Sequence, residues 1–410
     1  MNLVTVNVES IRIGQPLPFP LRDESGTLLA RKGYVVKGLD ELNVMVGRRN
    51  QLFIDVDDSE SYHRAYMGKL DSLVREEKPL GQIAESQFST FELESSRDTT
   101  TVGEPDWLDL QGQTHAMLRD MDAKSFGTRL NKLQMQLNRH LTTNPDGTLF
   151  ALIYISCKEV SVYSATHAML VSVMCSLAAR EVLKWPAERE ATLCKAALTM
   201  NIGMSDLQDR LARQHEAPSP EQRRQIDQHC IRSVSLLEQL GITEPCWLEA
   251  VLDHHARTPG PLTGRSEGQR MARLIQRADM FAACLAPRAS RPSKSPASAM
   301  QASYFDENRE IDEAGAALIK TLGIYSPGTF VRLTTDEIAV VIKRGGNTTT
   351  PRVAVLINRA GMPTGELILR DTSKREFRIV SGVLQRDVKV QINLERLLAL
   401  TKLPRSDRPW

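Results

Sequence analysis

Residues 163–204 carry the pattern that most restricts what this chain can fold into. After His167, apolar residues recur at helical spacing, at Leu170, Val173, Met174 and Leu177. Pro186 starts the connection to a second apolar run, residues 193–202. Because apolar residues at this spacing line one side of a helix, we expect two amphipathic helices at the centre of a helical domain.

Helical periodicity continues on both sides of this stretch, from about residue 107 to about residue 321. The first helices are outlined by six apolar residues, Leu118, Met121, Leu130, Leu133, Met135 and Leu137. An N-P-D-G run at residues 144–147 interrupts the periodicity and is typical of a turn. The pattern predicts an all-helical domain over residues 107–325.

The N-terminal end is expected to be a small α+β module at residues 1–80. Apolar residues alternate along residues 3–8 and 51–56, as in half-buried strands, and helical spacing follows at residues 61–73. Residues 81–106 are rich in Ser, Thr and acidic residues and have few apolar anchors. We expect them to form a polar linker.

The C-terminal end returns to strand periodicity. Residues 329–333, 338–342 and 353–358 are apolar or alternate, and turn residues separate them. We expect residues 326–410 to form a second β module that closes with a helical tail. The expected fold class is therefore mainly α, with an all-helical domain flanked by small N-terminal and C-terminal β modules.

Charge and cysteine content restrict the partners and the compartment. The 52 basic and 50 acidic residues leave a net charge of +2, so no extended polyanion such as DNA is expected as a partner. The six cysteines form no C-x-x-C pair and are expected to be buried, reduced thiols. The N-terminus lacks a signal-peptide pattern, and no segment has the roughly 18 apolar residues that a membrane span needs. We expect a cytoplasmic protein without a membrane span.

Five residues with metal-ligand chemistry lie within the helical domain: His167, His229, His254, His255 and Asp279. A single histidine near a helix start, such as His167 or His229, is more often a capping or surface residue than a ligand. The adjacent pair His254-His255 is harder to explain in this way, because two neighbouring imidazoles can point to different groups. Asp279 lies in an apolar helix, where a carboxylate is costly to bury unless it is paired or binds a cation.

The order and spacing of these residues resemble the HD-GYP family of cyclic-di-GMP phosphodiesterases, within the HD phosphohydrolase superfamily. The resemblance covers about residues 152–325. His167 matches the first histidine of the family pattern, and His229-Cys230 falls on its H-P motif. His254 and His255 match its H-H-E segment, and Asp279 matches the aspartate of its A-D-x-F motif.

The resemblance also implies ligands and partners. Residues 287–292 look like the R-P-Y-R/K segment of the family, whose basic residues contact phosphate, here Arg288 and Arg291. Cyclic-di-GMP or a related cyclic dinucleotide is the implied ligand, and other signalling proteins are implied as partners. The implied cofactor is a divalent metal ion of the Mn, Fe or Mg type.

The sequence departs from the family pattern where the metal chemistry lies. Met200, Asn201 and Met204 fall on the histidine, aspartate and lysine of the H-D-I-G-K motif, and the G-Y-P loop is missing. An amide lacks the negative charge that bridges two cations, and a thioether is a weak donor for such metals. The remaining residues are expected to hold one divalent cation or none, and no catalytic residue is assigned.

Five arginines follow the histidine pair, at Arg257, Arg265, Arg270, Arg273 and Arg277. They either form a solvated helix face or, because guanidinium groups suit phosphate, contribute to dinucleotide binding. The sequence thus predicts a bacterial cyclic-di-GMP-related signalling protein with a degenerate, inactive HD-GYP domain that acts by ligand or partner binding. The alternative is a metal-dependent phosphodiesterase with a reduced metal site.

Overall fold

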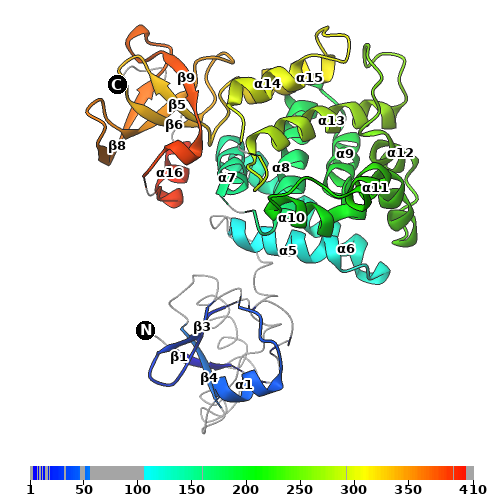
Figure 1. Cartoon of the computed structure of the whole chain (residues 1–410), viewed down its shortest axis with the longest axis vertical. Helices are drawn as coiled ribbons and strands as arrows, with labels where there is room; N and C mark the ends of the chain where they lie inside the picture. The colour runs from blue at the N-terminus through cyan, green and yellow to red at the C-terminus, as the bar shows by residue number, and fades with distance from the viewer. Residues whose placement is uncertain are drawn as a thin grey trace, which may run out of the picture. The chain divides into compact units, whose positions relative to one another are not determined.

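The chain divides into two compact units in the computed structural model, Met1–Glu104 and Pro105–Trp410 (Figure 1). The structure describes residues 3–55, with gaps, and residues 106–402 apart from 159, 292 and 391. The helix expected at residues 61–73 and the linker expected at 81–106 lie outside the described residues, except for residue 106. Each unit is considered by itself.

The first unit contains a small antiparallel sheet with strand order β1-β4-β2-β3. Its elements are β1 (Leu3–Val6), β2 (Leu21–Arg22), β3 (Leu28–Ala30), α1 (Leu39–Val46) and β4 (Leu52–Asp55). This unit has an apolar core of its own, which includes Val6, Leu21, Leu52 and Ile54. The expected N-terminal β structure is confirmed for the described residues.

The second unit begins with a helical part. Its helices are α5 (Trp107–Arg119), α6 (Ala123–Thr143), α7 (Pro145–Lys158), α8 (Tyr163–Leu177), α9 (Ala187–Thr199), α10 (Ser205–Arg213), α11 (Pro220–Gln239), α12 (Pro245–Asp253), α13 (Glu267–Leu285), α14 (Pro296–Tyr304) and α15 (Glu313–Leu322). A π-helical segment, Ala178–Leu183, extends α8, and a 3₁₀ turn, Ile202–Met204, follows α9. The expected helical domain is confirmed.

Helix α8 is the centre of this part. All 15 of its residues are buried, because α5, α7, α9, α10 and α13 pack around it. The expectation of an amphipathic helix is therefore wrong for α8: polar residues on its outer side face other helices, not solvent. By length and composition alone, the segment Tyr163–Leu183 is long and apolar enough to cross a membrane. An 18-residue window within it has a mean hydropathy of 1.2, but 78% of this window is buried inside the protein.

Two expectations about the first helices are corrected. Residues 144–147 do not form a separate turn, since α7 begins at Pro145 and the Asn144 side chain accepts a hydrogen bond from the Gly147 N–H. An Asn-Pro pair suits a helix start as well as a turn, because the proline occupies the first helical position. Met121 lies between α5 and α6, and Met135 is 68% exposed, so neither belongs to the core.

The unit ends in a β module. Its elements are β5 (Phe330–Leu333), β6 (Ile338–Lys343), β7 (Arg352–Ile357), β8 (Pro363–Asp371), β9 (Ile379–Val383) and α16 (Leu394–Thr401), with sheet order β8-β7-β6-β5-β9. All pairs are antiparallel. The expected C-terminal β module and helical tail are confirmed.

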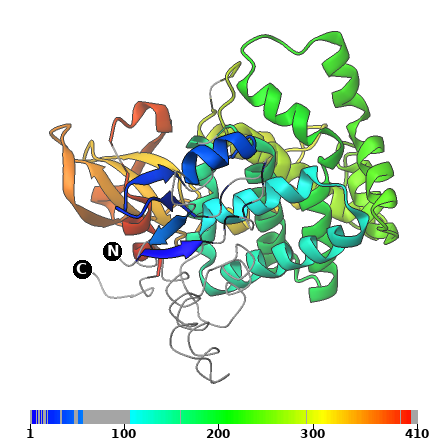
Figure 2. The ribbon, with the colours of Figure 1, turned by 90° about the horizontal axis from the view of Figure 1, so that it is seen from below.

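The β module packs against one end of the helical part, as Figures 1 and 2 show in orange and red. One face of the central strands forms a separate apolar cluster that includes Val341 and Val353. The other face, which includes Val340 and Ala354, joins the core of the helices. Strands buried on both faces read as continuous apolar runs, which explains the run at residues 338–342.

A buried ion pair also joins the two parts of this unit. Arg344, just after β6, places its Nε 2.6 Å from Asp146 of α7, and only 5% of the Asp146 side chain is exposed. The same guanidinium donates to Glu181 at 2.8 Å and to the Thr321 carbonyl at 2.9 Å. One arginine therefore connects the sheet to three helical segments.

We expect Asp146→Ala to lower the free energy of unfolding by about 2–3 kcal/mol, below the roughly 3–5 kcal/mol for a fully buried pair, because the partly buried Arg344 loses its closest charge partner but keeps Glu181. Urea unfolding followed by circular dichroism measures this loss. The control is Arg332→Ala, which removes an exposed pair with Asp336 at 4.0 Å and is expected to cost less than about 1 kcal/mol. Equal losses in the two variants would contradict the structural role of Arg344.

Candidate metal centre

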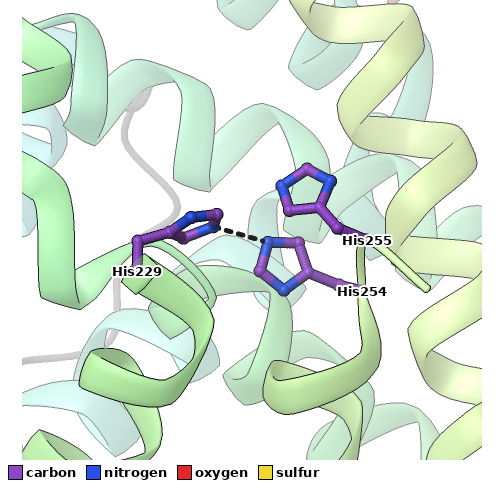
Figure 3. Close-up of side chains that lie close together, drawn as sticks. All are labelled: His229, His254 and His255. Carbon is purple, nitrogen blue, oxygen red and sulfur yellow. Dashed lines mark hydrogen bonds between the residues drawn. The ribbon is translucent and has the colours of Figure 1, made fainter. Parts of the chain in front are cut away.

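Three histidines converge from two segments of the second unit. His229 lies in the middle of α11, His254 is the residue that ends α12, and His255 follows it (Figure 3). His254 is fully buried, His229 is 3% exposed, and His255 is exposed. The helix end turns the two neighbouring imidazoles to different depths, with one inside the domain and one at its surface.

The nitrogens of the three rings are close enough to share a cation. One ligand nitrogen from each residue lies within 4.8 Å of the other two, and Nε2 of His229 is 3.2 Å from Nε2 of His254. Two nitrogens bound to one tetrahedral ion at 2.0–2.1 Å are about 3.3 Å apart. The observed separation therefore matches two ligands of a common ion.

The hydrogen bonds on the far side of each ring decide which nitrogen can bind. Nδ1 of His229 lies 2.5 Å from the Ile226 carbonyl, and Nδ1 of His254 lies 2.7 Å from the Val251 carbonyl. A carbonyl only accepts, so each Nδ1 carries the hydrogen and each neutral ring presents a bare lone pair at Nε2. Backbone carbonyls hold metal-binding histidines in this orientation in many proteins.

The contact between the two Nε2 atoms, drawn as a dashed line in Figure 3, is a hydrogen bond only when one ring carries an extra proton. Burial and the neighbouring His255 and His229 lower the pKa of His254 to about 3. Burial also lowers the pKa of His229. Both rings are therefore neutral near pH 7, and two lone pairs face each other at 3.2 Å. A cation bound to both nitrogens satisfies this arrangement.

His167 and Asp279 form a second part of the site. His167 is buried in the first turn of α8, and its Nε2 is 2.7 Å from Oδ1 of Asp279 on α13. Burial by itself would raise the pKa of Asp279, but the hydrogen bond and charge of His167 outweigh it and hold the pKa well below its usual range. The Asp279 charge also raises the pKa of His229 and His254 against the effect of burial, so the pair lies within electrostatic range of the three histidines.

The structure therefore gathers the five predicted ligands as a group of three and a group of two. The capping or surface explanation is wrong for His167 and His229, because both are buried. Imidazole nitrogens with one carboxylate are a donor set that suits a divalent transition metal ion.

The residues that depart from the motif lie at the end of α9 and in the 3₁₀ turn that packs on α11, the helix of His229. Met200 and Asn201, at the end of α9, are buried, and no partner of Asn201 Oδ1 is found among the described residues. The next turn packs tightly on α11, because a Cβ on Gly203 would come within 3.0 Å of the His229 carbonyl oxygen. The turn that follows Asn201 therefore packs against the helix that carries His229.

Two of the five arginines have structural roles. Arg273 and Arg277 are buried on α13, and both pair with Glu307 and Asp312 at 2.7–3.3 Å. The solvated-face explanation is therefore wrong for these two residues. Their guanidinium groups are engaged inside the protein, so they are also poor candidates for phosphate contacts.

Arg288 and Arg291 have a different environment. Backbone hydrogen bonds of 2.9 Å join them in both directions across a tight turn after α13. The Nε atoms of both arginines are buried, and neither Nε has a hydrogen-bond partner within the part of the chain that the structure describes. Arg288 also lies over the ring of Tyr163, at 5.0 Å, and that ring stacks on His167 with centroids 5.4 Å apart. A stacked path therefore connects Arg288 to the His167–Asp279 pair.

Tyr163 and Gln276 contribute to the site but were not predicted from the sequence. Gln276 donates to the Ala256 carbonyl at 3.0 Å, next to His255, and accepts from Arg273 at 2.7 Å. It thereby connects the histidine loop to the helix that carries Asp279. A glutamine three residues before a candidate ligand in one helix lies on the same side of it, and this spacing was a usable signal.

Comparisons with known proteins give one distant match. No family model and no curated protein matches the chain. Among solved structures, the chain is similar to Bd1817, described as a HDG"Y"P protein, from Bdellovibrio bacteriovorus. The match covers 77% of this chain and 98% of that chain, with 16% identity and a TM-score of 0.42. This similarity is distant.

Metal binding is expected to stabilise the protein through His254. For chelator-treated protein, a divalent metal at 100 times its dissociation constant should add about 2.7 kcal/mol of stability, measured as a rise in the unfolding temperature. His254→Ala should remove most of this metal-dependent rise, and His215→Ala, which changes an exposed histidine, should keep it. If both variants respond like the unchanged protein, the histidines do not hold the metal.

Gln276→Leu is expected to weaken metal binding by about 10–100-fold, because outer hydrogen-bond partners of metal ligands have effects of this size. The change removes the contact that holds the loop after His255. Isothermal titration with Zn²⁺ measures the affinity. Gln113→Leu is the control, since it removes a comparable 2.9 Å side-chain bond to Asp109 on α5. An unchanged affinity in Gln276→Leu would rule out a positioning role.

Proposed function

We propose that this chain is a cyclic-di-GMP-related signalling protein. Its helical domain holds a single divalent cation and binds a cyclic dinucleotide without an efficient hydrolytic site. One observation carries this proposal: two neutral imidazoles direct bare Nε2 atoms at each other across 3.2 Å. Such an arrangement is unfavourable without a cation and satisfied with one.

The nature of the donors supports one cation rather than two. The three histidines supply three ligands of a single four-coordinate ion and leave the fourth position for water or a bound ligand. A second ion needs an anionic oxygen that bridges it to the first, and Asn201, which falls on the aspartate of the family motif, offers only a neutral amide. Two-metal hydrolysis stabilises the attacking and the leaving oxygen together, so its loss removes a main source of catalysis.

The environment of Arg288 and Arg291 supports ligand binding. Each has a buried Nε–H for which the described residues supply no acceptor, and buried donors are normally satisfied. Phosphate oxygens accept well from guanidinium groups, often in pairs. Arg288 also lies over the Tyr163 ring that stacks on His167, so a phosphate bound there would lie near the His167–Asp279 pair.

The cysteines support a reducing compartment such as the cytoplasm. All six are free in the described structure, and three of them, Cys175, Cys194 and Cys284, are buried. Burial raises the pKa of Cys194 to about 12, which keeps this thiol protonated and unreactive. Free thiols throughout a chain are usual for cytosolic proteins.

Calorimetric titration with cyclic-di-GMP, with and without Mn²⁺, tests the proposal. We expect binding heat in the unchanged protein and a loss of about 10–100-fold in affinity in Arg288→Ala, the effect of a hydrogen bond to a charged group. Arg139→Ala, which changes an exposed arginine on α6, should bind normally. No heat at high micromolar ligand would contradict dinucleotide binding and favour a scaffold that binds other signalling proteins.

A product assay distinguishes the proposed binding protein from the alternative, a metal-dependent phosphodiesterase with a reduced metal site. Incubation of metal-loaded protein with cyclic-di-GMP, followed by chromatography, should return the intact ligand. Formation of the linear dinucleotide at about 1 s⁻¹ or faster, an ordinary enzyme rate, would establish the phosphodiesterase instead.

A further inference from the structure

The loop that follows His255 is organised around one arginine. Arg265 donates from Nε to the Pro261 carbonyl at 2.9 Å and from Nη1 to the Thr258 hydroxyl at 2.8 Å. Its Nη2 lies 2.6–3.3 Å from the carbonyl oxygens of Thr258, Pro259 and Gly260. One guanidinium group therefore holds residues 258–261 from the inner side of the loop.

Two further contacts hold the beginning and the end of the loop. At its beginning, Gln276 of α13 donates to the Ala256 carbonyl at 3.0 Å. Near its end, Leu262 is buried, and its N–H donates to the carboxylate of Glu313 on α15 at 2.9 Å. Gly260 has a φ of +105°, a conformation that residues with a side chain rarely adopt. The loop is therefore held along its length, although residues 257–261 are exposed.

His255 needs this support more than the two buried histidines do. The ring of His254 is fully buried, and the ring of His229 is nearly so. His255 is exposed, yet its ring centroid lies 4.2 Å from that of His254 and 5.1 Å from that of His229. Holding a backbone in one conformation costs entropy, and solvent does not offset that cost for an exposed residue. The contacts of the loop begin directly after His255 and can offset it.

We propose that Arg265 is a positioning residue for His255. It holds the loop so that the exposed imidazole is already in place as the third metal ligand beside His229 and His254. This inference rests on the proposed metal site and adds how that site is completed. Without Arg265, the loop would have to be ordered when the ion binds, and that cost would lower the affinity.

The charge of Arg265 acts on a cation in the opposite direction. A guanidinium group repels a divalent ion, so a purely electrostatic role predicts tighter metal binding when the arginine is removed. Loss of the hydrogen bonds predicts weaker binding. Arg265→Lys separates the two effects, because lysine keeps the charge but lacks the planar group that reaches several acceptors at once.

Isothermal titration of the full chain with Zn²⁺ tests this inference. We expect Arg265→Ala and Arg265→Lys each to bind Zn²⁺ at least about tenfold more weakly, because ordering the backbone of even one residue corresponds to a loss of this size. His255→Ala should also weaken binding, because it removes a ligand. Adding Arg265→Ala to His255→Ala should cost no further affinity, because Arg265 acts through His255.

Arg224→Ala is the matched control, since it removes an exposed arginine that pairs with Glu221 on α11, and it should bind like the unchanged protein. Unchanged or tighter binding in Arg265→Ala would overturn the positioning role. An equal further loss in the His255→Ala background would also overturn it, because Arg265 would then act on the whole domain. If Arg265→Ala does not fold, as judged by circular dichroism, Arg265→Lys decides the outcome. No binding heat in the unchanged protein would overturn the metal site itself and this inference with it.

Discussion

Complete burial of helix α8 is the constraint on which the second unit depends. A helix without a solvent-facing side must be covered all round, and α5, α7, α9, α10 and α13 provide that cover. The start of such a helix has N–H groups that water cannot reach, and Asp209 of α10 accepts from the Ser164 N–H at 2.7 Å. Arg119 of α5 neutralises the same buried carboxylate at 2.9 Å. The packing thus fixes the first turn of α8, and with it His167.

The candidate site is a consequence of that packing. Helix α13 lies against α8 and brings Asp279 to His167, while α12 lies against α13 and ends at His254. Burial also determines the chemistry, because it keeps the inner imidazoles neutral, and backbone carbonyls accept hydrogen bonds from their Nδ1 atoms. A neutral imidazole with a fixed hydrogen is the form that binds a metal.

The sequence anticipated much of the fold for physical reasons. Strand and helix periodicity depend on local burial, so the helical centre and both β modules could be recognised. The spacing of apolar residues led to a wrong prediction of a solvent-facing side on α8. Such a pattern indicates which residues are apolar, but it does not indicate how many helices surround them. Met135 shows the opposite error, since an apolar residue at core spacing lies 68% exposed on α6. Arg273 and Arg277 could not be assigned from the sequence, because their partners Glu307 and Asp312 are about thirty or more residues away.

By itself, the sequence determined the order of the modules, the identity of the five candidate ligands and the loss of charge at Met200 and Asn201. These are properties of residue type and spacing. Tertiary structure alone decided that three histidines share one centre while His167 pairs with Asp279. Distances of 3–4 Å between side chains depend on how α11 and α12 pack and where α12 ends. Local sequence patterns do not predict that packing.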